Sequence, residues 1–270
     1  MITSLSLPPL NYFLVNFLTF SLFFVFLIKK SKQHKNLKYF FLYGWLFGFG
    51  YFAISLYWIS IALTFDQNFN FLFPLAFFII PAFLALFYGL VSFFFIILKP
   101  IKIVSSFLMF SLIFGITEYI RGSILTGFPW NLIVYSFSNQ LEFLGVLSIL
   151  GTYGLNLFCI SLFTCPAIFI ISGTKKNIGV CIFFLIFVIS FLIYGFSYKE
   201  KFNNANKIIN DFNVRVIGSN ISIDRFYSNV NSVLVIEELI KISNPNMNQK
   251  TIFIWPEGIL PEISQRELKE

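Results

Sequence analysis

The sequence is poor in charged residues, in histidine and in cysteine. Only 11% of its 270 residues are charged and 57% are hydrophobic, which leaves too little polar surface for a soluble globular protein. His34 is the one histidine, which excludes metal sites and catalytic triads that need two. Cys159, Cys165 and Cys181 lie in apolar runs without metal-ligand spacing, and we interpret them as ordinary helix residues. We therefore expect no metal and no cofactor.

Long apolar runs take the place of these residues. A helix needs roughly 20 residues to cross a hydrocarbon core of about 30 Å. Runs of suitable length cover residues 9–28, 39–63, 71–98, 103–120, 141–171 and 178–197. The sequence predicts a polytopic α-helical membrane domain with about six transmembrane helices.

Lysines mark alternate loops between these runs. The first, third and fifth loops carry Lys29, Lys30, Lys32, Lys35, Lys38, Lys99, Lys102, Lys175 and Lys176, whereas the second carries Asp66. The positive-inside rule places the lysine-bearing loops in the cytoplasm, and this topology explains the net charge of +7 better than nucleic acid binding does. With six spans, we expect the N-terminus and everything after Tyr198 to be extracytoplasmic.

The composition becomes polar after residue 198. We predict a transmembrane domain over residues 1–198, a linker over 199–213, and the first part of an extracytoplasmic α/β domain over 214–270. Within that part, residues 214–217 read as a strand, 225–242 as a helix with Asp224 as its N-cap, and 251–255 as a buried strand. Two strands do not close a core, so we expect this α/β fragment to be incomplete.

Glu257 is the main candidate for chemistry. It follows the predicted strand at its carboxyl end, where α/β folds place active sites, and a carboxylate there can act as a general base. A glutamate after a strand is more often a solvated turn residue. The segments around it and in the membrane part favour the catalytic interpretation.

Three segments carry a resemblance that spans essentially the whole chain. They are Ile254-Trp255-Pro256-Glu257, the stretch from Glu118-Tyr119-Ile120-Arg121-Gly122 to Gly127-Phe128-Pro129-Trp130-Asn131, and Gly151-Thr152-Tyr153-Gly154-Leu155-Asn156. Together they resemble the bacterial apolipoprotein N-acyltransferases, which belong to the nitrilase superfamily.

The resemblance implies an enzyme of the bacterial inner membrane. Such enzymes transfer an acyl chain from a phospholipid to the N-terminal diacylglyceryl-cysteine of an apolipoprotein, using a Glu-Lys-Cys triad in an extracytoplasmic nitrilase domain. The cysteine thiolate attacks the phospholipid ester, the glutamate takes the proton, and the lysine stabilises the oxyanion. The implied partners are thus a phospholipid donor and a diacylated apolipoprotein acceptor.

Of this triad, the resemblance assigns only Glu257 as general base. The family's lysine and cysteine fall beyond Glu270, and Lys250 lies at the wrong end of the strand to replace the lysine. We therefore expect a truncated acyltransferase that is inactive alone. Two alternatives stay open: a membrane half completed in trans by a separate fragment with the rest of the nitrilase domain, or a non-catalytic membrane protein descended from the family.

Several polar and small residues of the membrane part also carry expectations. Glu118 and Arg121, spaced i, i+3, predict a pair on one helix face near the outer interface. The segment 128–130 is either an aromatic anchor at the interface or an entry point for phospholipid. Gly44 and Gly48 predict close helix packing, and Asn156 a hydrogen bond to a neighbouring helix.

Overall fold

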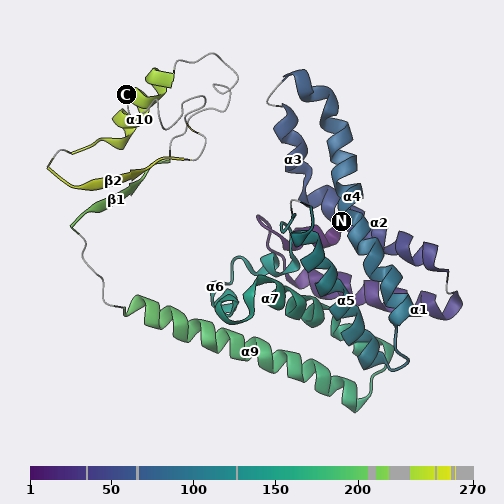
Figure 1. Ribbon diagram of the computed structural model, residues 1–270. Helices are drawn as coiled ribbons and strands as arrows, with labels where there is room; N and C mark the ends of the chain where they lie inside the picture. Colours follow the sequence, from purple (N-terminus) through teal and green to yellow (C-terminus); the bar gives the residue numbers. More distant parts are fainter. Residues whose placement is uncertain are drawn as a thin grey trace. The chain divides into compact units, whose positions relative to one another are not determined.

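The computed structural model describes residues 1–34, 36–64, 67–125, 127–205, 211–218, 232–246, 248–256 and 259 (Figure 1). The chain divides into a membrane unit, residues 1–63 and 71–204, and a second unit, residues 64–70 and 205–270. In chain order the elements are η1 (Ile2–Ser6), α1 (Leu14–Gln33), α2 (Leu37–Ser55), α3 (Tyr57–Ile61), η2 (Ala62–Thr64), η3 (Gln67–Leu72), α4 (Phe73–Leu98), α5 (Ile103–Ser123), η4 (Ile133–Phe137), α6 (Leu141–Leu144), α7 (Leu147–Thr164), α8 (Pro166–Ile171), α9 (Lys175–Asn203), β1 (Asn213–Val216), α10 (Ser232–Ser243) and β2 (Thr251–Ile254).

The membrane unit is a helical bundle. Among the described residues, six helical segments are long and apolar enough to cross a membrane: Leu14–Gln33, Leu37–Ser55, Asn68–Leu98, Ile103–Ser123, Leu147–Ile171 and Asn177–Asn203. Each overlaps one of the six predicted runs; seven of the twelve ends agree within three residues, and the other five differ by five to eight. The predicted polytopic helical fold is confirmed, and the protein is a multi-pass membrane protein.

Two of the predicted runs are broken. The second was expected to be one helix to residue 63, but α2 ends at Ser55 and α3 starts after Leu56, whose φ and ψ of −117° and 9° are not helical. The fifth divides into α6, α7 and α8, with Gly151 at a φ of +66° inside α7. The hydropathy of a residue indicates whether it suits lipid or a protein core, but it does not indicate the backbone angles. The hydropathy pattern therefore does not predict these helix breaks.

Glycines bring α2 and α4 close together. A Cβ atom at Gly48 would lie 2.8 Å from the Cβ of Tyr88, and one at Gly44 would lie 2.5 Å from Ser92 Oγ. A side chain at either position would push the helices apart, because interiors are close-packed. The close packing predicted from the two glycines is confirmed.

Phenylalanines fill the centre of the membrane unit. Phe20, Phe24, Phe110 and Phe114 are fully buried, and their rings meet at centroid distances of 5.3 to 5.7 Å. Helix α9 contributes little to this core, since only 11% of its span is buried. Its C-terminal part is fastened to α6 by an ion pair of 2.6 Å between Lys199 and Glu142.

The second unit pairs β1 and β2 in parallel, with Val214 opposite Ile252. Helix α10 lies between them in sequence and buries Val235 and Leu239 against Ile259. The predicted order of strand, helix and strand is therefore found. Glu257 and the predicted N-cap Asp224 lie outside the described residues.

Candidate functional site

The loop after α5 is held by the side chain of Arg121. One terminal nitrogen of its guanidinium donates to the carbonyl oxygens of Phe128 at 2.7 Å and Trp130 at 3.1 Å. The main-chain carbonyl of Arg121 accepts from the amide of Phe128 at 3.1 Å. Gly127, at a φ of +75°, allows the chain to turn back toward the helix. Arg121 thus fastens the loop from both its side chain and its main chain.

Glu118 holds the other side of the same guanidinium. Its two carboxylate oxygens accept from Arg121 Nε at 3.2 Å and from the second terminal nitrogen at 2.7 Å. Both side chains are fully buried, and the ring of Phe52 lies 5.3 Å from the guanidinium carbon. The predicted i, i+3 pair on one face of the helix is confirmed, and this face of α5 is buried within the bundle. Burial without a partner would be costly for either charge.

Asn131 connects the loop to the end of α2. Its carbonyl oxygen accepts from the hydroxyl of Tyr51 at 2.8 Å, and its side-chain amide donates to Ser55 Oγ at 2.8 Å. The hydroxyl of Ser55 in turn donates to the carbonyl of Tyr51 at 2.8 Å. Asn131 has a φ of +58°, a conformation that asparagine tolerates better than most residues. The loop is thus attached to α5 on one side and to α2 on the other.

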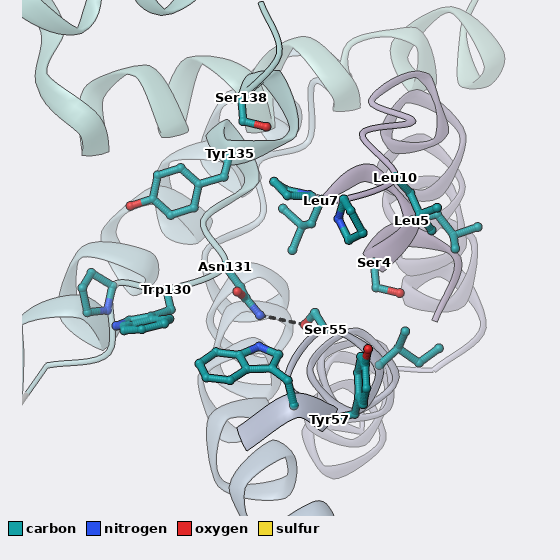
Figure 2. A pocket seen from close by; sticks show the side chains of 15 residues that line it. Ser4, Leu5, Leu7, Leu10, Ser55, Tyr57, Trp130, Asn131, Tyr135 and Ser138 are labelled. Carbon is teal, nitrogen blue, oxygen red and sulfur yellow. Dashed lines mark hydrogen bonds between the residues drawn. The ribbon is translucent and has the colours of Figure 1, made fainter. Parts of the chain in front are cut away.

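A cavity of about 750 Å³ opens beside this loop (Figure 2). Trp130 and Tyr135 lie on one side of it, and Ser4, Leu5 and Leu10 on the other, with Asn131 and Ser55 between them. Its lining comprises Ser4, Leu5, Leu7, Pro8, Pro9, Leu10, Ile54, Ser55, Tyr57, Trp58, Pro129, Trp130, Asn131, Tyr135 and Ser138. Its size is that of cavities that bind small molecules or parts of lipids.

The chemistry of the lining is neutral. None of the fifteen described residues that line the cavity is charged. The hydroxyl of Tyr135 and Asn131 Oδ1 form no hydrogen bond with another described residue, so one donor and one acceptor are available to a ligand. Partial burial raises the pKa of Tyr135, which keeps its hydroxyl protonated. The rings of Trp58 and Trp130 are 5.4 Å apart at 30°. The cavity suits an apolar ligand with a few neutral polar atoms.

A smaller cavity of about 260 Å³ lies on the other side of the loop, between α4 and α5. Its lining is almost wholly apolar and includes Phe83 and Phe87 from α4, with Phe128 from the loop. Arg121 also lines it. The loop is therefore a wall shared by two cavities, with Phe128 on one side and Trp130 on the other.

The structure also shows where the predicted residues Asn156 and Trp130 lie. Asn156 accepts a hydrogen bond of 3.0 Å from the amide of Val134 in the short helix η4, rather than from another spanning helix. Trp130 is 52% exposed and lines the larger cavity, a position that suits an anchor and an entry point alike. Sequence reasoning missed Ser55, Tyr135 and Ser138, because nothing in an apolar run or in the segment between two runs singles out a hydroxyl that faces a cavity.

No group of three or more histidine, cysteine or acidic side chains able to hold a metal ion occurs among the described residues. Cys159, Cys165 and Cys181 are free thiols. Cys159 and Cys165 are buried within the bundle, as expected of helix residues.

A known protein family matches the part of the chain that contains this site. The family model of the apolipoprotein N-acyltransferase N-terminal domain matches residues 1–165, which include both cavities and the Glu118–Arg121 pair. The chain belongs to the apolipoprotein N-acyltransferase family. The resemblance found in its motifs is thereby confirmed.

Some curated apolipoprotein N-acyltransferases are similar to the chain along almost all of its length, and others along about two thirds. The protein of Rhodopseudomonas palustris is 29% identical over 98% of this chain and 51% of its own length. The protein of Allorhizobium ampelinum is 28% identical over 96% of this chain and 50% of its own length. The protein of Rhizobium etli is 36% identical over 68% of this chain and 35% of its own length. The chain spans about half the length of the apolipoprotein N-acyltransferases that it matches over nearly its full extent.

Proposed function

We propose that this protein takes part in the transfer of an acyl chain from a phospholipid to the N-terminal diacylglyceryl-cysteine of an apolipoprotein. The observation that carries the proposal is the larger cavity, which is built from family segments and lined by neutral, largely apolar groups. A lipid ester or a diacylglyceryl group offers the matching chemistry, with long apolar chains and a few neutral oxygens. The Tyr135 hydroxyl can donate to such an ester oxygen, whereas Asn131 Oδ1 can accept from an N–H of the peptide part of the acceptor.

The connectivity supports an extracytoplasmic position for this cavity. The cavity lies where α2 ends, where α5 continues into its loop, and before α1 begins. The opposite ends of these helices carry Lys29, Lys38 and Lys102, which the positive-inside rule assigns to the cytoplasm. We propose that the cavity, and the chain beyond α9, face the periplasm of a bacterial inner membrane.

We propose Glu257 as the general base of the reaction, on the resemblance of its strand segment alone. The triad's lysine and cysteine match no residue of the 270, so we propose that a nitrilase segment outside these residues supplies them, in the same polypeptide or in a second one. The sheet of the second unit supports this idea. Val214, Val216, Ile252 and Ile254 are 48 to 72% exposed, and α/β domains cover such apolar strands with a further layer.

A binding experiment tests the proposal without depending on turnover. The chain is placed in phospholipid nanodiscs, with Trp45 and Trp255 replaced by phenylalanine so that emission comes from Trp58 and Trp130. A synthetic lipopeptide with an N-terminal diacylglyceryl-cysteine should change this emission in a saturable way. The matched control peptide lacks the lipid and should not.

Trp130→Ala on this background should raise the lipopeptide concentration that half-saturates the remaining Trp58 signal, because it removes a wall of the cavity. The Trp45→Phe change of the background should not affect binding, since the indole of Trp45 donates to the carbonyl of Ala82 between α2 and α4 and lies outside the cavity lining. The absence of saturable binding, or equal binding of the unlipidated peptide, would overturn the proposal.

A further inference from the structure

The guanidinium of Arg121 connects a helix to a loop that forms a cavity wall. It uses Nε and one terminal nitrogen for Glu118, and the other terminal nitrogen for the carbonyls of Phe128 and Trp130. Only a planar guanidinium presents donors in these two directions at once. A lysine would keep the charge but would not reach both sets of acceptors.

The carboxylate of Glu118 fixes the direction of this guanidinium. It accepts two hydrogen bonds from Arg121 and none from a described residue of the loop, so it acts on the loop through Arg121. It also neutralises the buried positive charge. This matters because the larger cavity has no charged residue in its lining, and an unpaired cation bonded to the carbonyl of the lining residue Trp130 would disfavour an apolar ligand.

The loop held in this way carries the groups that face the larger cavity. Trp130 packs against Trp58, and Asn131 is fixed separately by Tyr51 and Ser55. If the Arg121 side chain lost its bonds, the loop would keep its attachment to α2 and the main-chain bond from Phe128 to residue 121, and would lose the side-chain bonds to the carbonyls of Phe128 and Trp130. Trp130 lies between the attachments to α5 and to α2, so its position depends on both.

We propose that Arg121 is a positioning residue for ligand binding: it fixes Trp130 as a cavity wall through the carbonyls of Phe128 and Trp130, with Glu118 orienting its guanidinium. The proposal rests on the function proposed above for its ligand, the diacylated lipopeptide. It assigns to the buried ion pair a role beyond helix stability. Arg121 itself does not line the larger cavity and takes no part in bond making.

The test uses the full chain in nanodiscs on the Trp45→Phe/Trp255→Phe background. Arg121→Lys should raise the Kd for the lipopeptide at least about 10-fold, the equivalent of one lost hydrogen bond to a charged group. It should also increase the quenching by acrylamide of the combined emission of Trp58 and Trp130, because a loosened loop exposes the Trp130 indole. Glu118→Gln should act in the same direction with a smaller effect.

Ser21→Ala is the matched structural control. It removes a buried hydrogen bond of 3.1 Å, from Ser21 to the carbonyl of Phe163, far from the loop in sequence and outside both cavities. It should lower the thermal midpoint without changing quenching or Kd. The conservative lysine variant should fail to restore binding, whereas a purely electrostatic role would let it do so.

The double variant Glu118→Gln/Arg121→Gln keeps the test decisive should the lysine variant fold poorly, since it removes both buried charges together. Unchanged quenching and Kd in either folded variant would overturn the proposal. So would a loss of affinity that Ser21→Ala reproduces at the same thermal midpoint. If the unaltered chain binds no lipopeptide, the proposed function fails, and the quenching comparison alone then decides whether Arg121 positions the loop.

Discussion

Arg121 in the membrane unit and Arg215 in the second unit each bind the main-chain carbonyls of a segment that follows a helix, but they do so in different surroundings. Arg121 donates to the carbonyls of Phe128 and Trp130 and lies over the ring of Phe52. Arg215 donates to the carbonyls of Ser243 and Asn244, at 2.7 and 3.0 Å, and lies 5.9 Å from the ring of Phe253. Both bind a segment that leaves a helix.

The difference lies in how each charge is compensated. Arg121 is fully buried and has Glu118 as its counter-ion, whereas Arg215 is exposed and no carboxylate pairs with it among the described residues. Water solvates the rest of the charge on Arg215, but lipid and packed phenylalanines offer nothing to Arg121. A buried membrane arginine therefore comes with an acid, and the pair becomes a rigid unit that a surface arginine does not form.

The exposed apolar residues of the two units differ in the same way. Leu18, Leu22 and Leu46 of the membrane unit are 52 to 56% exposed and suit a hydrocarbon environment. Val214 and Val216 are as exposed or more so, yet belong to a strand of an α/β unit. In the membrane unit such exposed apolar side chains suit contact with lipid. In the second unit they suit a sheet face that a further layer of secondary structure would cover.

The largest expected effect separates chemistry from binding. In membranes that contain this protein together with the proposed nitrilase segment, Glu257→Gln should lower the rate of acyl transfer about 10²–10⁴-fold, because the proposed general base is lost. Lipopeptide binding by the membrane unit should stay unchanged. Transfer of labelled acyl chains from phospholipid to a diacylated lipopeptide measures the rate. Unaltered turnover would remove Glu257 from the mechanism.

The second effect tests the comparison of the arginines directly. Arg121→Met should lower the free energy of unfolding by about 3–5 kcal/mol, because it leaves the buried Glu118 carboxylate unpaired. Arg215→Met should cost only about 1 kcal/mol, the value of an ordinary exposed hydrogen bond. Denaturant titration in detergent, followed by circular dichroism, gives both values. Equal losses of unfolding free energy in the two variants would show that the surroundings of the two arginines do not determine their contributions.

A third effect concerns packing between helices. Gly48→Ala should destabilise the membrane unit by about 1–3 kcal/mol, because its methyl group would meet Tyr88 in a full interior. Gly179→Ala is the matched control, since a Cβ there would meet nothing within 4 Å. It should be neutral or slightly stabilising, as alanine favours a helix. The thermal midpoints of the two variants, measured in the same detergent, test this prediction. Equal midpoints would contradict it.

The smallest effect concerns the ion pair that fastens α9. The hydrogen bond from Lys199 lowers the pKa of the Glu142 carboxyl below its usual range. A lowered folded-state pKa adds stability above the unfolded value of about 4.3, and that stability disappears as the pH falls through the folded value. Glu142→Gln should therefore lower the thermal midpoint slightly at pH 7 and leave it unchanged at pH 2–3. High salt should shrink the difference at pH 7, since exposed pairs are screened.

Much of this protein can be read from its sequence, and the reasons are physical. Six runs of apolar residues had to become spanning helices, because lipid offers no partner to backbone polar groups outside a helix. The motifs around Glu118 and Trp130 were enough to indicate the family, which the match to residues 1–165 confirms. The predicted inactivity of the isolated chain, its domain boundaries and the role of Glu257 stay predictions.

The sequence by itself determined the solvent of each region, because hydropathy and charge are properties of residues taken one at a time. The tertiary structure alone decided that Arg121 reaches two carbonyls of a later loop, and that Ser55, Tyr135 and Ser138 face one cavity with Trp130. Those facts depend on where helix breaks and positive φ angles turn the chain. Apolar patterning does not encode such turns, since lipid and core accept the same side chains on either side of a break.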